Sequence, residues 1–144
     1  MTVYADTSFL AALYLFDDLT PEANAYMAHH PHPLILTELQ QAEARNTFRL
    51  RVAQKRSSSE EVYRALVHFE RDIAEGIFVL TSPDRPRTFR EFEQLSKKYS
   101  ERGGHRFADL LHVAAALTLD ARNFLTFDQR QARLAKAVGL KTPL

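Results

Sequence analysis

The sequence predicts an α/β fold in which a central parallel sheet is covered by helices on both faces. Two observations predict it. Short apolar runs typical of buried strands alternate along the whole chain with longer segments of helical periodicity, and acidic residues follow two of those runs directly. The 144 residues contain no repeat, low-complexity tract or long linker. We therefore expect a single domain spanning residues 1–144.

The first half of the chain is expected to supply two strands and four helices. Thr20-Pro21-Glu22 is a typical helix start, with Thr as the cap and Pro at the first helical position. Pro31 and Pro33 end that helix, and a run of serines followed by two Glu residues begins the fourth. In order, the elements are a strand at 2–6, helices at 8–16 and 23–29, a strand at 34–37, and helices at 38–54 and from about 59 to 73.

The second half repeats the alternation of strand and helix. Gly103-Gly104 separates two helices, and the second of these carries an apolar stripe that includes Leu110, Ala114 and Leu117. The elements are a strand at 77–80, a helix at 88–99, a helix from about 106, a strand at 124–127, a helix at 129–138 and a final edge strand at 140–142.

Composition narrows the class of protein. The chain is 45% hydrophobic and 26% charged, as in ordinary soluble globular proteins. It has no Cys, which excludes disulfides and thiolate zinc sites. No apolar run approaches the roughly 20 residues that span a membrane, so we predict a cytoplasmic protein without membrane contact.

The net charge of +1 excludes a uniformly basic nucleic-acid binder, but basic residues are concentrated between positions 44 and 56. This stretch includes Arg49, Arg51 and Lys55 and contains no acid. We predict that these three residues contact a polyanion such as RNA. The alternative is an ordinary solvated helix face.

Two acids follow predicted strands. Asp6 ends the first strand and precedes Thr7, whereas Asp128 ends the fourth and is preceded by Thr126 two positions earlier. In open parallel sheets ligands bind outside the carboxyl ends of the strands, so both acids are candidates for one site. Either could instead be an N-cap for the helix that follows it.

Two further acids lie on predicted helices. Glu43 has Ala42 and Asn46 beside it, small or polar residues where a core helix would carry Leu. Asp109 lies in the first turn of an apolar helix, where the helix dipole also favours a carboxylate. Taken alone, each has a structural explanation. Together the four acids predict a site for Mg²⁺ or Mn²⁺, because converging carboxylates repel one another unless a hard cation neutralises them.

Four segments in this order resemble the PIN domain, of the bacterial and archaeal type that includes the VapC toxins of type II toxin–antitoxin systems. They are Val3-Tyr4-Ala5-Asp6-Thr7-Ser8, Glu43 with Asn46, the stretch from Arg106 to Ala116 that contains Asp109, and Leu125-Thr126-Phe127-Asp128. Glu38 is a second acid near Glu43, but the Asn three residues after Glu43 favours Glu43 as the family's acid.

The resemblance implies a three-layer α/β/α fold and a metal-dependent endoribonuclease that cleaves RNA. It implies that Asp6 and Asp109 bind Mg²⁺ or Mn²⁺ directly, that Glu43 binds metal or positions the attacking water, and that Asp128 acts through water. Thr7 or Thr126 would orient carboxylates. A VapB-like antitoxin is the implied partner, and we expect a homodimer. The alternatives are a non-catalytic PIN-like module that binds RNA or protein, and a stand-alone RNA-processing nuclease.

Overall fold

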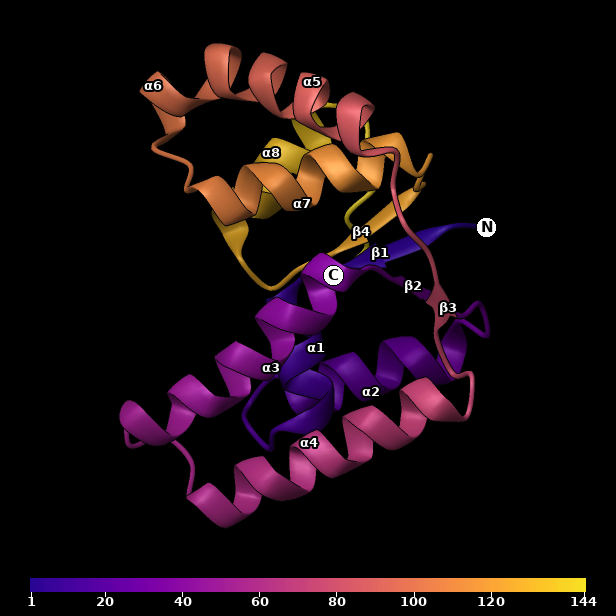
Figure 1. Cartoon of the computed structure of the whole chain (residues 1–144), viewed down its shortest axis with the longest axis vertical. Coiled ribbons are helices and arrows are strands. Elements are labelled where there is room, and N and C mark those ends of the chain that lie inside the picture. Colours follow the sequence, from indigo (N-terminus) through magenta and orange to yellow (C-terminus); the bar gives the residue numbers. More distant parts are fainter.

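A computed structural model describes residues 1–144 and contains a four-stranded parallel sheet between two layers of helices (Figure 1). The strands are β1 (Val3–Ala5), β2 (Leu34–Leu36), β3 (Val79–Leu80) and β4 (Asn123–Leu125), arranged in the order β3-β2-β1-β4. Every neighbouring pair is parallel. The predicted α/β/α architecture is confirmed, and β1, which leads to Asp6, is a central strand.

The helices follow the chain from one face of the sheet to the other (Figure 1). The first layer holds α1 (Thr7–Tyr14), α2 (Thr20–His29), α3 (Glu38–Ala53) and α4 (Ser59–Ala74). The second holds α5 (Arg85–Leu95), the π-helix η1 (Ser96–Ser100), α6 (Glu101–Gly103), α7 (Phe107–Thr118) and α8 (Gln129–Ala137). None of these helices is both long enough and apolar enough to cross a membrane.

Alternation of side chains along the strands divides the core in two. Val3 and Ala5 of β1 pack with the first helical layer, in a cluster that includes Phe9 and Phe48. Tyr4, between them in sequence, faces the other way and packs with the second layer. β2 and β4 divide their side chains in the same manner. Both faces of these three-residue strands are buried, which explains why they form continuous apolar runs in the sequence.

Some boundaries differ from those expected. α5 begins at Arg85 rather than Thr88, because the Asp84 side chain accepts a hydrogen bond from the Arg87 backbone N–H and caps the helix there. Thr20 is not a cap: it lies inside α2, and its hydroxyl donates to the Ala12 and Leu15 carbonyls. The final edge strand is reduced to one parallel bridge between Lys141 and Asn123.

Gln40 fixes the position of α3 against the sheet. It is fully buried, and its side-chain amide donates to the Ala5 carbonyl at 2.7 Å and to the Ile35 carbonyl at 3.3 Å. Its side-chain oxygen accepts from the Thr37 backbone N–H in a capping box. Gln40 therefore ties the start of α3 to the last residue of β1, one position before Asp6.

Candidate active site

The four acids singled out from the sequence line one cleft at the carboxyl edge of the sheet. The cleft has a volume of about 320 Å³, and Asp6, Glu43, Asp109 and Asp128 are all among its lining residues. They arrive from the end of β1, from α3, from α7 and from the segment after β4. Glu38, the neighbouring acid on α3, does not line this cleft. The topology thus gathers carboxylates from four separate segments at one place.

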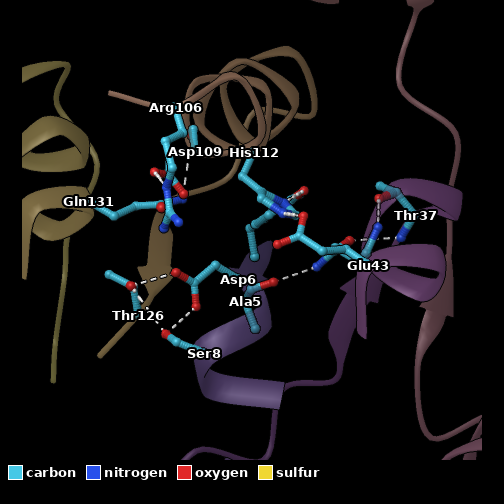
Figure 2. Close-up of polar contacts among 12 residues, drawn as sticks. Ala5, Asp6, Ser8, Thr37, Glu43, Arg106, Asp109, His112, Thr126 and Gln131 are labelled. Carbon is cyan, nitrogen blue, oxygen red and sulfur yellow. Dashed lines mark hydrogen bonds and ion pairs between the residues drawn. The ribbon is translucent and has the colours of Figure 1, made fainter. Parts of the chain in front are cut away.

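Asp6 lines the cleft. It is held by hydroxyl groups (Figure 2). It is 4% exposed. Ser8 donates to Oδ1 at 2.6 Å, Thr126 donates to Oδ2 at 2.5 Å, and the Phe9 backbone N–H donates to Oδ1 at 3.2 Å. Burial raises the pKa of Asp6, and the hydrogen bonds from Ser8 and Thr126 offset this only in part. The ionised form is therefore destabilised by its surroundings.

The capping alternative holds for both strand-end acids. Asp6 is the N-cap of α1 through its bond from Phe9, and Asp128 is the N-cap of α8 through bonds from the Arg130 and Gln131 backbone N–H groups. Thr126 connects the two acids, because its hydroxyl oxygen also accepts from the Asp128 backbone N–H at 3.0 Å. Capping and a place in the cleft are compatible roles for the same side chain.

Glu43 belongs to a buried chain of polar side chains. Its Oε2 lies 2.5 Å from Nε2 of His112 on α7, and Nδ1 of His112 lies 2.8 Å from the Tyr4 hydroxyl on β1. Burial, the largest influence, raises the pKa of Glu43, but the hydrogen bond and charge of His112, with smaller contributions from Thr7 and Arg106, leave it below its usual range. Glu43 is therefore ionised at neutral pH.

Asp109 faces a cation from its own helix. Nε of Arg106, the N-cap residue of α7, lies 3.4 Å from Asp109 Oδ2 (Figure 2). The Asp109 side chain is 16% exposed, whereas that of Arg106 is 79% exposed. An ion pair with one partner so exposed is weak. Arg106 thus lies beside Asp109 without being fixed there.

The donor set suits a hard divalent cation, although the side chains do not yet surround one. No three Asp, Glu or His side chains lie close enough together to hold a metal ion as they stand. Two observations nevertheless fit a cation in the cleft. Burial disfavours the ionised form of Asp6, which a neighbouring positive charge would stabilise. The buried hydroxyl of Thr7, which also lines the cleft, has no hydrogen-bond partner. Carboxylate oxygens without sulfur or nitrogen ligands match Mg²⁺ or Mn²⁺.

The three basic residues expected to contact RNA occupy different environments. Arg49 and Lys55 are exposed but do not line the cleft. Arg51 lines the cleft but is only 8% exposed, and its guanidinium is paired with Asp17 at 3.2 Å. Arg56 and Arg106 line the cleft as well, and both are exposed.

Several residues of the cleft were not identified from the sequence. Ser8 directly holds Asp6, a role that the sequence suggested only for Thr7 or Thr126. Its position two residues after Asp6 on the first turn of α1 is a local signal that could have found it. His112 lies one turn after Asp109, but its contact with Glu43 joins residues 69 positions apart and leaves no local signal.

Comparison with known proteins agrees with this architecture. Residues 3–137 match the PIN domain family. Among solved structures, VapC20 from Mycobacterium tuberculosis, described as a Sarcin-Ricin loop cleaving toxin, is similar with a TM-score of 0.68 at 18% identity, over 97% of this chain and 98% of that one. FitAcB from Neisseria gonorrhoeae has a TM-score of 0.67 at 14% identity, covering 97% and 95%.

VapBC2 from Rickettsia felis, in a structure bound to a DNA fragment from its promoter, has a TM-score of 0.64 at 15% identity and covers 99% of this chain and 97% of that one. At these identities the similarity establishes the fold. A search of curated proteins gives no match by sequence.

Proposed function

The chain belongs to the PIN-domain family, and we propose that it is a metal-dependent endoribonuclease that serves as the toxin of a toxin–antitoxin pair. The observation that carries the proposal is the presence of Asp6, Glu43, Asp109 and Asp128 in one cleft, brought there by four separate segments. Independent helix caps have no reason to meet in this way. VapC20, a Sarcin-Ricin loop cleaving toxin, shares the fold.

Asp6 and Asp109 are the proposed direct ligands of Mg²⁺ or Mn²⁺, with Glu43 as a third ligand or as the group that orients the attacking water. Asp128 would act through a water molecule, since its Oδ1 already caps α8. A divalent ion held there would polarise the scissile phosphodiester and lower the pKa of a nearby water. Ser8 and Thr126 each donate a hydrogen bond to one carboxylate oxygen of Asp6. Both donors lie on the side of Asp6 that is away from Glu43 (Figure 2).

Basic residues beside the cleft would hold the RNA backbone. Arg56 and Arg106 line the cleft and are exposed, so they can reach a phosphate. Arg49 and Lys55 are exposed on the segment that carries Arg56 and would add positive charge for the RNA. Arg51 lines the cleft, but its charge is paired with Asp17. Because phosphate contacts of this kind carry little sequence information, the choice of RNA target would rest on other features.

The test is RNA cleavage by the purified chain with Mn²⁺, with EDTA as the metal-free control and Asp109→Asn as the inactive variant. We expect cleavage that stops in EDTA and in the variant. A variant that cuts at the wild-type rate would assign the activity to a contaminating nuclease and reject the site. If the wild type binds RNA with Mn²⁺ present but never cuts it, the chain is instead a binding module.

We further propose a homodimer and a VapB-like antitoxin partner. The apolar residues of α1 and α4 are mostly used in the core, with Phe9, Val62 and Phe69 buried. Phe16, just after α1, is 98% exposed, and the edge strand β3 exposes Val79 and Leu80. Light scattering of the purified chain tests the dimer, and co-purification from the native host tests the partner. Recovery of a monomer without a partner would favour a stand-alone RNA-processing nuclease.

A further inference from the structure

A buried polar chain connects the interior of the sheet to the cleft. It starts at the hydroxyl of Tyr4, passes through both ring nitrogens of His112 and ends at Oε2 of Glu43. Tyr4 is fully buried and stacks on Phe124 with ring centroids 5.5 Å apart, and His112 is 1% exposed. Figure 2 shows the His112 ring reaching from α7 to the Glu43 carboxylate.

The three residues lie on the three elements that carry the proposed ligands. Tyr4 is two residues before Asp6 on β1, and His112 is three residues after Asp109 on α7. Glu43 is on α3 and makes no hydrogen bond to either of those acids. His112 therefore connects Glu43 on α3 to Tyr4, two residues before Asp6.

The partners of His112, Glu43 and Tyr4, indicate where the ring carries its protons. An ionised Glu43 only accepts hydrogen bonds, so Nε2 of His112 carries the proton and donates it to Oε2. Tyr4 is buried and keeps its phenolic proton. In the neutral imidazole the Tyr4 hydroxyl donates to Nδ1 and selects the Nε2–H tautomer, as an outer partner does for the histidines of metal sites. In the charged imidazole Nδ1–H donates to the Tyr4 oxygen instead, and Nε2–H donates to Glu43 in both forms.

A purely structural role does not account for this arrangement. Position 112 is surrounded by apolar residues of α7, where an aliphatic side chain would be buried without any need for partners. A buried imidazole there requires a hydrogen bond at each nitrogen, and one of the two is made to an acid at the wall of the cleft. Glu43 Oε1 is left without a hydrogen bond of good geometry, although Thr7 lies close enough to lower the pKa of the carboxyl.

We propose that His112, held by Tyr4, is a positioning residue that fixes the Glu43 carboxylate through Oε2 and leaves Oε1 free for a divalent cation or for the attacking water. This inference rests on the proposed function, because it assumes that the cleft binds such a cation. Removing an outer partner of this kind lowers metal affinity on the order of 10- to 100-fold.

The test is a double-mutant cycle on Mn²⁺ affinity, measured by calorimetry with MnCl₂ and the full chain without RNA. We expect His112→Leu to weaken binding on the order of 10- to 100-fold. In the Glu43→Gln background, the same substitution should have no further effect, since His112 acts only through Glu43. His112→Gln, which keeps an amide donor close to the position of Nε2, should retain most of the affinity.

Two further variants separate positioning from general damage to the core. Tyr4→Phe removes only the hydroxyl and keeps the ring stacked on Phe124, so it should fold even if His112→Leu does not. Tyr4→Phe should also weaken Mn²⁺ binding. In the wild-type protein, the ¹⁵N shifts of His112 should report a proton on Nε2. Thr118→Val is the matched control. Thr118 is buried on α7, but its hydroxyl bonds only to the Ala114 carbonyl, so Mn²⁺ affinity should not change.

The outcomes distinguish this inference from the nuclease proposal. The positioning role would be overturned if His112→Leu lowered Mn²⁺ affinity equally in the wild-type and Glu43→Gln backgrounds. It would also be overturned if His112→Leu and Tyr4→Phe both kept wild-type affinity. Neither result would contradict the nuclease proposal. A wild-type chain that binds Mn²⁺ and shows the coupled cycle but cuts no RNA would overturn the nuclease alone. A wild-type chain that binds no Mn²⁺ would overturn both.

Discussion

The hydroxyl of Thr126 donates a 2.5 Å hydrogen bond to Oδ2 of Asp6, joining the segment after β4 to the end of β1 across 120 positions of sequence. The same oxygen accepts from the Asp128 backbone N–H, so one side chain is bonded to two of the four acids. Parallel pairing of β1 with β4, in the register Ala5 with Leu125, sets these residues side by side. Thr126 thereby connects two of the acids that line the cleft.

Replacing Thr126 with Val should therefore damage both stability and metal binding. Val has the shape of Thr but leaves Oδ2 of the buried Asp6 and the Asp128 backbone N–H each without a hydrogen-bond partner, at a cost of about 1–3 kcal/mol. Mn²⁺ affinity should fall on the order of 10- to 100-fold because Asp6 loses an orienting bond. Thr126→Ser keeps the hydroxyl and should stay close to wild type in chemical denaturation and calorimetry. Equal behaviour of the Val and Ser variants would show that the hydroxyl has no such role.

Asp6→Asn should stabilise the metal-free protein at neutral pH. A carboxyl group whose pKa is raised on folding keeps its proton in the folded chain after the unfolded chain has lost it. The free energy of unfolding therefore falls as pH rises from about 3.9, the ordinary value for Asp, to the raised value, and the loss persists at higher pH. Asn does not ionise and avoids this loss.

Thermal unfolding in EDTA at several pH values measures the effect. The variant should melt above the wild type at pH 7, and the difference should shrink toward pH 4. Added Mn²⁺ should raise the melting temperature of the wild type far more than that of the variant. Asp120→Asn is the matched control, because Asp120 is 85% exposed at its side chain and its backbone φ of 53° suits Asn. Parallel pH profiles for wild type and Asp6→Asn would contradict the prediction.

Arg106→Gln should strengthen Mn²⁺ binding and weaken RNA binding. The guanidinium lies 3.4 Å from Asp109 and also lowers the pKa of Glu43, so it competes with a cation for both acids. The gain in Mn²⁺ affinity should be at most about fivefold, because exposed ion pairs contribute about 0.2–1 kcal/mol. RNA affinity at low salt should fall, since Gln cannot neutralise a phosphate. Arg90→Gln removes an exposed charge of α5 away from the cleft and should change neither quantity.

The sequence predicted the fold better than it predicted the contacts inside the cleft. Apolar runs such as Leu34–Leu36 carry local signals for strands, and Asp6 and Asp128 directly follow two other such runs. The sheet and the gathering of these two acids could therefore be predicted. The ordering along a parallel sheet then placed those acids at one edge.

The contacts that orient each acid could not be predicted in the same way. His112 lies in a stretch that locally indicates only an apolar helix, and tertiary packing of α7 against β1 and α3 is needed to reveal its two partners. Arg51 belongs by sequence to a basic stretch, yet the loop after α1 brings Asp17 against it. Charge counted along the chain does not show which side chains are already paired.

Arg51 should consequently behave differently from its basic neighbours. Its side chain is 10% exposed and that of Asp17 is 19% exposed, so Arg51→Gln leaves a largely buried carboxylate without its partner. We expect a loss of about 1–3 kcal/mol of unfolding free energy, between the values for exposed and fully buried pairs. Arg49 and Lys55 are exposed, and replacing both with Gln should leave stability unchanged.

RNA affinity should depend on Arg49 and Lys55 rather than on Arg51, the reverse of what we expect for stability. If Arg49 and Lys55 each neutralise a phosphate, the double Gln variant should have a shallower slope of log affinity against log salt. The slope should change by about 1.4, because each lost phosphate contact with a single strand changes it by about 0.7. Asp17→Asn frees the Arg51 charge and should cost stability without reducing RNA affinity, which separates the pair from the RNA surface. An unchanged salt slope in the double variant would place Arg49 and Lys55 on an ordinary solvated face. A flattened slope in Arg51→Gln, without loss of stability, would mean that Arg51 leaves Asp17 to bind RNA.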